Sequence, residues 1–188
     1  MTRILRRLIL RLVALQAVLL LVLTPTALAA NPTPGLTPPP PSDAICSTSP
    51  HGTICHVDGA FTREDPELTV CDNVVVDGSS SGTASRKLTY DATGALVKEQ
   101  RHVRFTGTLT NRSSGESIGY AGTFSLTFDF VAQTVTITGS QVRLLLPDGG
   151  VDVVQAGRVV VDLSQDPPVE VFLAGPKEAD ARICANLA

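Results

Sequence analysis

Tryptophan is absent from this sequence, and only two tyrosines, Tyr90 and Tyr120, are present. Sugar-binding surfaces stack their ligands on exposed aromatic rings, so this scarcity argues against a carbohydrate-binding surface. The sequence also shows no phosphate-binding loop, no paired inward carboxylates and no Ser/His/Asp set. These absences give little support to an enzyme, and no cofactor is expected.

Residues 1–30 are typical of a secretory signal peptide. Their start is basic, residues 12–23 form an apolar run, and residues 27–29 give a small-residue cleavage pattern. Arg6 and Arg7 loosely match a twin-arginine signal, but the leucine-rich run favours ordinary secretion. The competing interpretation is an uncleaved anchor, for which the run falls short of the roughly 20 residues of a spanning helix. We expect a secreted, extracellular protein without stable membrane insertion after cleavage.

Residues 31–42 contain six prolines, including four in succession. Such a run favours extended polyproline geometry and cannot build a hydrophobic core. The segment is therefore predicted to be a disordered linker that holds the domain away from the cleavage site. The alternative is a proline motif that binds another protein, whose identity the sequence does not indicate.

Residues 43–188 form one predicted folded domain of ordinary size. The signal peptide contains four of the 15 basic residues and none of the 18 acidic residues, so the mature chain is strongly acidic. An acidic surface repels phosphate backbones and anionic lipid headgroups. Nucleic acid is therefore not an expected partner.

The four cysteines all follow the signal peptide. An even number of cysteines in an oxidising compartment predicts two disulfides, and three pairings are combinatorially open. We favour Cys46 with Cys55 as a short local link, and Cys71 with Cys184 as a link from the first strands to the C-terminal tail.

Residues 117–131 alternate between apolar and small or polar side chains, with glycine at one of the apolar-parity positions. Successive side chains of a strand point to opposite faces, so this stretch predicts one long strand with a buried face. Similar alternation recurs before and after it, interrupted by turn signals. The pattern changes after residue 177, where Ala179, Ile183 and Leu187 recur every four residues, which predicts a short C-terminal helix.

Eight or nine short-linked strands predict an all-β fold. We expect an antiparallel up-and-down barrel of about eight strands with the C-terminal helix, and the alternative is a two-sheet sandwich. Glycines on the apolar faces, such as Gly122, favour the barrel because they permit coiling or leave interior space. Residues 79–82 are expected to form a flexible loop.

The sequence resembles an uncharacterised family of small secreted actinobacterial proteins over roughly residues 71–188. The segments that carry the likeness are residues 90–94, 107–111, 114–115, 135–139, 156–159 and 184–187. The resemblance implies a secreted protein with a lipocalin-like β-barrel shape, and it implies no activity.

Two sequence motifs have the residue types of a metal site and of a catalytic serine. Cys46, His51, Cys55 and His56 lie close enough in sequence to suggest zinc, but their spacing is irregular and oxidation competes for both thiols, so no metal is expected. Residues 78–82 match G-x-S-x-G without the helix that a nucleophile elbow requires.

Two isolated residues offer the only motive for catalysis. His102 could act as a general base in a cavity, but its parity is opposite to that of Val103, so it is predicted to lie on the outer face. Tyr120 lies on the apolar face. A barrel-cavity cyclase or isomerase is therefore the least favoured function, and no catalytic residue is assigned.

The favoured hypothesis is a secreted protein that binds a small apolar ligand inside the barrel. The alternative is an extracellular or cell-envelope structural or interaction protein. Six residues on the apolar parity of their strands are the candidate cavity lining: Val103, Phe105, Tyr120, Phe124, Leu126 and Phe128.

Overall fold

The computed structural model describes residues 35–71, 74–176 and 178–187. Alternating apolar and polar side chains, separated by turns, place most of these residues in strands. The elements are β1 (Ile45–Ser49), β2 (Gly52–Cys71), β3 (Val74–Tyr90), β4 (Leu96–Asn111), β5 (Ser117–Asp129), β6 (Thr134–Leu145), β7 (Val151–Asp162), β8 (Val169–Ala174) and α2 (Ala179–Leu187).

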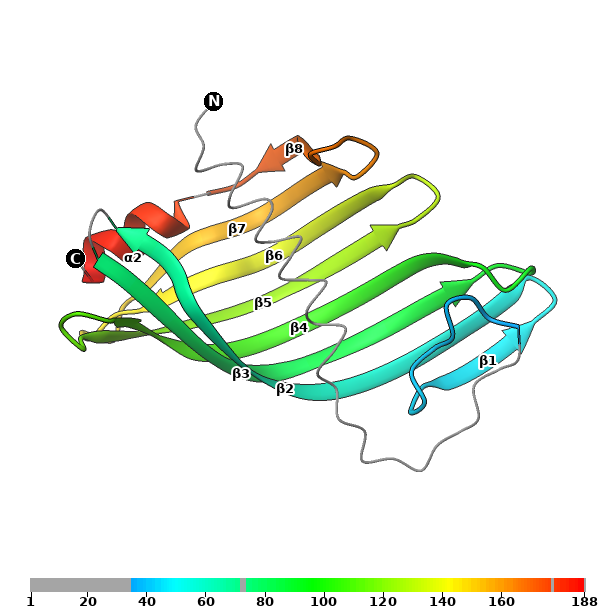
Figure 1. The fold of residues 1–188 in the computed structure, drawn as a ribbon, viewed down its shortest axis with the longest axis horizontal. Helices are drawn as coiled ribbons and strands as arrows, with labels where there is room; N and C mark the ends of the chain where they lie inside the picture. Colours follow the sequence, from blue (N-terminus) through cyan, green and yellow to red (C-terminus); the bar gives the residue numbers. More distant parts are fainter. Residues whose placement is uncertain (1–34, 72–73, 177, 188) are drawn as a thin grey trace.

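All eight strands belong to one antiparallel sheet whose spatial order follows the sequence from β1 to β8 (Figure 1). The antiparallel all-β fold and the short C-terminal helix are therefore confirmed. The predicted closure into a barrel is not seen, because β1 and β8 remain the two edges of the sheet. These edge strands have only 5 and 6 residues, whereas β2 has 20.

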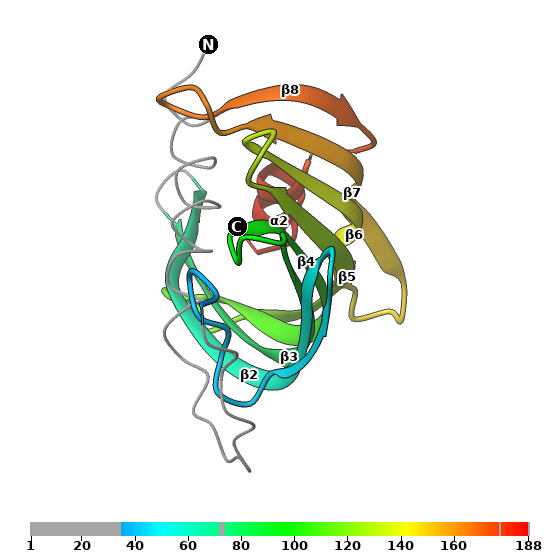
Figure 2. The same ribbon diagram turned by 90° about the vertical axis from the view of Figure 1, so that its right-hand side faces the viewer.

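The sheet curls along its length into a half-open form, with α2 inside the curve at one end (Figure 2). We call its concave face the trough. Strand register identifies the side chains that face it: Arg101 pairs with Leu126, Val103 with Phe124, and Leu109 with Ile118. Many of these side chains are buried, while their sequence neighbours on the convex face are exposed. The alternation in β5 is thus confirmed as an inner and an outer face.

Glycines in the trough allow aromatic rings to lie flat across the neighbouring strand. Phe105 pairs with Gly122, and Tyr120 pairs with Gly107. A Cβ added at Gly122 would meet the Phe105 ring at 2.3 Å, and one added at Gly107 would meet the Tyr120 ring at 2.5 Å. The space expected at Gly122 is therefore occupied by Phe105.

Buried side chains gather in three clusters along the trough. The helix-covered cluster contains Cys71, Val76, Leu109, Ile118, Tyr120, Leu144, Val154, Ile183 and Leu187. The open cluster contains Val103, Leu126, Val135, Ile137 and Val159. The N-terminal cluster contains Leu36, Ala44, Cys55, Val57, Leu88 and Tyr90.

The chain just before β1 packs against the sheet. Leu36 is buried in the N-terminal cluster, and the Thr37 amide donates a hydrogen bond to the Gly94 carbonyl at 2.8 Å. The Leu96 amide donates in turn to the Thr37 carbonyl at 3.0 Å. The part of the predicted linker that the structure describes, residues 35–42, therefore includes contacts with the folded domain.

Both predicted disulfides are confirmed. Cys46–Cys55 joins β1 to β2, and Cys71–Cys184 joins the end of β2 to α2. Asn111 further holds the helix, because its side-chain amide donates a 2.7 Å hydrogen bond to the carbonyl of Leu187. This contact satisfies one of the carbonyls that a helix C-terminus leaves without an internal partner.

Several predicted element boundaries are wrong. Residues 79–82 lie inside β3 rather than in a flexible loop, because small serines and glycines fit a strand that is paired on both sides. The sequence interpretation also missed β1 and most of β2. β6 continues past Gly139 through a register irregularity near Val142.

The predicted signal peptide and residues 31–34 lie outside the described residues. Among the residues that are described, no helix is long and apolar enough to cross a membrane.

Candidate functional site

The six predicted lining residues all face the trough, but they do not share one environment. Val103 and Leu126 are buried in the open cluster, and the rings of Phe105, Phe124 and Phe128 lie partly exposed beside it. Tyr120 belongs to the helix-covered cluster instead. The structure therefore brings five of the six together around the uncovered middle of the trough.

Aromatic contacts link the two clusters. The Phe105 ring lies edge-on to Tyr120, with ring centroids 5.3 Å apart, and edge-on to Phe124 at 6.3 Å. Such edge-to-face pairs contribute roughly 0.5–1.5 kcal/mol beyond the burial of their area. Farther along β5, Phe128 stacks on Phe130 and lines an open depression of about 150 Å³ at the rim of the trough.

Tyr120 is buried and has an apolar role. Burial raises the pKa of the Tyr120 hydroxyl, and a hydrogen bond with Ser80 and the charge of Arg63 oppose that rise. The Tyr120 ring packs in the helix-covered cluster.

A charged cluster lies in the trough beside the open cluster, and it consists of Arg86, Glu99 and Arg101. Glu99 Oε1 accepts hydrogen bonds from Arg86 Nε at 2.7 Å and from Arg101 Nε at 2.5 Å. Glu99 Oε2 accepts from Arg101 Nη2 at 3.1 Å. The exposed side-chain fractions are 12% for Arg86, 5% for Glu99 and 6% for Arg101.

The electrostatics of the charged cluster keep Glu99 ionised. Burial alone would raise the pKa of Glu99, but the hydrogen bonds and positive charges of Arg101 and Arg86 outweigh it and hold that pKa below its usual value. The Arg101 guanidinium also lies over the Phe128 ring, 4.9 Å from its centroid. A cation over an aromatic face is favourable, and more so where water is excluded.

The charged cluster was not predicted from the sequence. A signal was available, because Glu99 and Arg101 share the parity of Val103 and Phe105 and therefore the face that points inward. Arg86 has the same parity as Leu88 in β3. Charged residues at the alternate strand positions that otherwise carry inward-facing apolar side chains could have identified this site.

His102 lies on the convex face, as predicted from its parity. Its Nδ1 is 3.2 Å from the hydroxyl of Ser125, and the pair is exposed. His102, Asp58 and Ser85 line an open depression of about 350 Å³, which their strand register places on the outer side of the sheet. Tyr120 and His102, the two residues that motivated an enzyme, are thus on opposite faces.

The remaining motifs are structural. Cys46 and Cys55 form a disulfide, so neither thiol is available to zinc. Within the described ranges, no group of three or more His, Cys, Asp or Glu side chains is arranged to hold a metal ion. The G-x-S-x-G match lies within β3 and does not form a nucleophile elbow.

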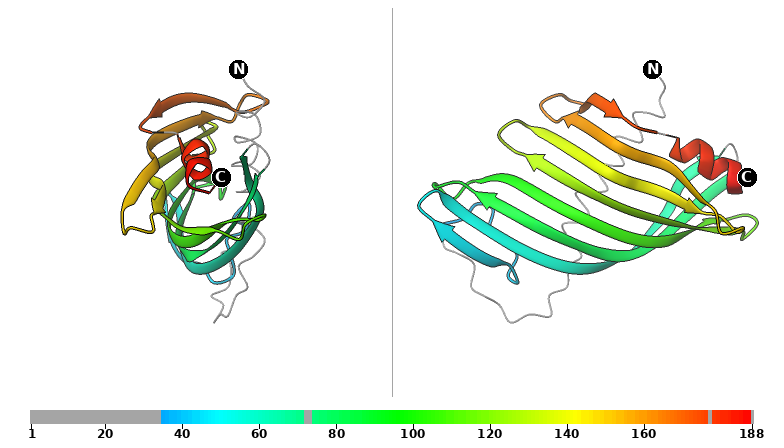
Figure 3. Two further views of the ribbon diagram at one scale, coloured as in Figure 1. Left: turned by 90° about the vertical axis from the view of Figure 1, so that its left-hand side faces the viewer. Right: turned by 180° about the vertical axis from the view of Figure 1, so that it is seen from behind.

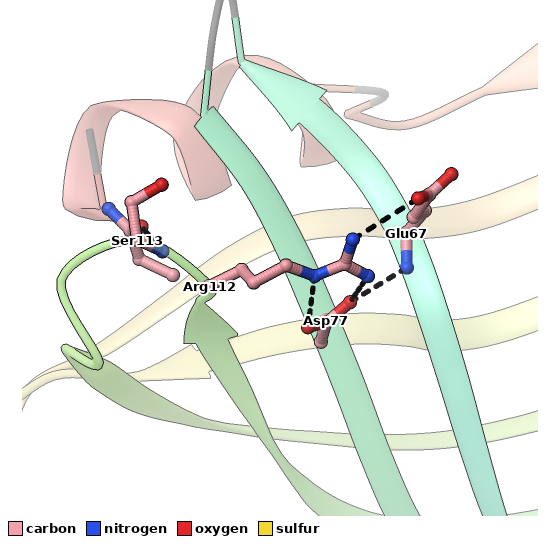
Figure 4. A network of polar contacts seen from close by, with 5 residues as sticks. Glu67, Asp77, Arg112 and Ser113 are labelled. Carbon is pink, nitrogen blue, oxygen red and sulfur yellow. Dashed lines mark hydrogen bonds and ion pairs between the residues drawn. The ribbon is translucent and has the colours of Figure 1, made fainter.

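An exposed polar network supports the sheet near α2 (Figure 4). Arg112 donates to both carboxylate oxygens of Asp77, at 2.9 and 2.6 Å, and to Glu67 at 3.2 Å. The hydrogen bond from Arg112, joined by one from the Glu67 amide, lowers the pKa of Asp77 to about 2. These contacts tie the irregular end of β2 to β3 and to the turn after β4, so we assign them no binding role.

Comparisons with protein-family models, with curated protein sequences and with solved structures find no match to this chain. The site is therefore interpreted from its own geometry. Two features define it: an uncovered apolar stretch with partly exposed aromatic rings, and a charged cluster set into the same face.

Proposed function

We propose that this is a secreted protein that binds an apolar ligand in the trough, over the open cluster. The observation that carries the proposal is the set of aromatic rings left partly exposed there: Phe61, Phe105, Phe124 and Phe128. The two disulfides support the compartment, because such bonds persist in oxidising, extracellular surroundings.

The position of α2 supports binding in the middle of the trough. Among the described residues, α2 covers one end of the concave face and no helix or strand crosses its middle (Figure 3), while Leu36 and Ala44 pack at the other end. Ligand sites are concave and mostly apolar with a few polar groups, and the open cluster beside the charged cluster has this character. A ligand that covers the rings gains roughly 25 cal/mol for each Å² of apolar surface removed from water.

Titration with N-phenyl-1-naphthylamine, a neutral dye that fluoresces in apolar surroundings, tests this proposal. We expect saturable binding by the native protein and at least tenfold weaker binding by Phe124→Ser. The matched control is Phe172→Ser, because Phe172 is 48% exposed and pairs on the convex face, where its ring contacts Arg158. Equal dye binding by all three proteins would place the dye elsewhere and contradict the proposal.

A second variant, which places a larger side chain in the trough, tests the proposal if Phe124→Ser does not fold. Ala84 is partly buried and packs beside the open cluster, so Ala84→Leu adds side-chain volume to the trough without removing a ring. We expect it to reduce dye binding. In parallel, native mass spectrometry of protein purified without detergent should reveal a bound mass that organic extraction removes.

A second candidate function is that of an extracellular interaction protein, and edge strand β8 favours it. Four of its side chains are exposed and apolar: Val169, Val171, Phe172 and Leu173. An exposed apolar edge strand can pair with a strand of another chain, and here the partner would be a second copy of this protein. Sedimentation analysis should then show a dimer that Val171→Lys dissociates, and a monomer at high concentration would remove this candidate.

A further inference from the structure

We propose that the charged cluster binds the anionic headgroup of an amphiphile whose single acyl chain lies over the open cluster. This inference rests on the proposed function and names the class of ligand. It begins from a charge imbalance: the cluster holds two guanidinium groups and one carboxylate, and all three side chains are at most 12% exposed.

An excess positive charge in a buried setting calls for an anion. Transferring an unpaired charge from water into an apolar site is costly, and buried charges are normally paired. Glu99 can neutralise only one of the two arginines that contact it. A carboxylate or phosphate headgroup beside them would balance the second positive charge.

The cluster also retains unused hydrogen-bond donors. Among the described residues, the Arg86 side chain makes one hydrogen bond, from Nε to Glu99, and its Nη groups are not among the buried polar atoms that lack a partner, so they remain accessible to solvent and to a ligand. Arg101 donates from Nε and Nη2 to the same carboxylate. The guanidinium fork is well matched to planar carboxylate and phosphate oxygens, so these donors suit such a headgroup.

The position of the charged cluster determines in which direction the acyl chain of the ligand would run along the trough. Arg86, Arg101 and Leu126 are successive partners across β3, β4 and β5. The next inward-facing positions of β4 toward α2 are Val103 and Phe105. At about 3.3 Å per residue, the apolar lining extends roughly 13 Å from Arg101 to Phe105. A headgroup at the arginines would thus have its chain directed along the trough toward α2.

The opposite direction is already occupied. On that side the N-terminal cluster packs Leu88 and Tyr90 against Leu36 and Ala44. Burial raises the pKa of Tyr90, which is only 2% exposed, so this side offers a neutral and filled core. The acyl chain therefore has one open course, over Phe124 and Phe105.

Displacement of the neutral dye by three ligands of equal chain length tests the inference in the full-length secreted protein. The ligands are hexadecanoic acid, hexadecyl phosphate and hexadecanol, compared at pH 8, where the first two are ionised. We expect at least one anionic ligand to bind about tenfold or more tightly than the alcohol, as charge-assisted hydrogen bonds to arginine would produce. The two anionic arms distinguish a carboxylate from a phosphate headgroup.

Substitution of Arg86 assigns the preference to the cluster. In Arg86→Gln, the ratio of anion to alcohol affinity should fall to near one, whereas Arg104→Gln, on the exposed convex face, should retain the native ratio. Arg86→Lys keeps the charge but loses the fork geometry and should give an intermediate ratio, which also serves if Arg86→Gln does not fold.

The outcomes separate the two proposals. Hexadecanol binding as tightly as both anions in the native protein would overturn the headgroup site and leave apolar binding intact. Dye binding with an anion preference that Arg86→Gln retains would also overturn it. Failure of the dye and of all three ligands to bind would overturn the proposed function itself, and the headgroup site with it.

Discussion

The end of the trough that carries α2 differs from the middle of the trough. At one end of the trough, α2 covers Val76, Leu109 and Leu144, each of which is fully buried. In the middle of the trough, β4 and β5 carry Phe105 and Phe124, each with part of its ring exposed. Each stretch contains a cluster of buried apolar side chains, and among the described residues α2 contributes only to the first. The comparison indicates that the fold completes one core internally and leaves the other surface for a ligand.

Removal of the Cys71–Cys184 disulfide, which links α2 to β2, should cause the largest loss of stability. Cys71 and Cys184 are 113 residues apart, and the chain-entropy model assigns such a link about 5 kcal/mol, whereas Cys46 and Cys55, 9 residues apart, receive about 2.5 kcal/mol. Paired Cys→Ala variants measured by urea unfolding should therefore rank in this order. The reverse order would show that α2 is held mainly by its other contacts.

Loss of the Glu99 negative charge should be the next largest effect, because it leaves two buried guanidiniums without the carboxylate that neutralises one of them. We expect Glu99→Gln to lower the unfolding free energy by about 3 kcal/mol, in the range seen when one partner of a buried pair is removed. Glu116→Gln, on an exposed turn residue, should change it little. A neutral result for Glu99→Gln would show that water reaches the cluster freely.

The lowered pKa of Glu99 predicts how the stability of the fold depends on pH. Since the pKa of Glu99 is lowered by folding, its contribution is complete above the unfolded value of about 4.3 and is lost as the pH falls through the lower folded value. The native protein and Glu99→Gln should therefore converge in stability on acidification below about pH 4. Unfolding midpoints measured from pH 7 to pH 2 test this, and a constant difference would contradict it.

A matched pair of valines sharpens the comparison between the covered and open stretches. Val76 is 0% exposed beneath α2, whereas Val161 is partly buried beside the open cluster. Truncation to alanine should cost about 2–3 kcal/mol at Val76 and about 1 kcal/mol at Val161, because exposed surface can relax without leaving a cavity. A saturating apolar ligand should stabilise the native protein, and Val161→Ala should weaken that effect more than Val76→Ala.

The boundary between the two stretches gives a further comparison, between Gly122 and Gly119. A Cβ at Gly122 would lie 2.3 Å from the Phe105 ring and 2.4 Å from the Gln141 carbonyl, so Gly122→Ala should cost about 1–3 kcal/mol. Gly119 faces outward on the same strand, and its added Cβ would meet only the Leu145 side chain at 3.2 Å. Gly119→Ala should therefore be tolerated, as thermal unfolding of both variants can show.

Local patterns were sufficient for much of the fold. Alternation predicted β5 to within a few residues, and a period of four predicted α2. The glycine- and serine-rich start of β3 was wrongly assigned to a loop, because its extended conformation is stabilised by pairing with β2 and β4. Pairing with distant segments leaves no local signal in composition.

The candidate site was only partly predictable. Parity identified the inward face of β4 and β5 and placed His102 outside, and both assignments hold in the structure. Parity did not identify the contact of Arg86 with Glu99, because the two residues come from different strands whose register is set by pairing. It also assigned space to Gly122 that a ring from β4 fills.

The sequence by itself determined the strand faces, the C-terminal helix and the cysteines available for cross-linking, because side-chain alternation and residue chemistry are local properties. Only the tertiary structure decided that the sheet stays open, that α2 covers one end of the trough, and that two arginines share one carboxylate there. These features depend on curvature and register accumulated over many strands. Small shifts in curvature or in register change which side chains meet, and no short stretch of sequence encodes the curvature or the register of the whole sheet.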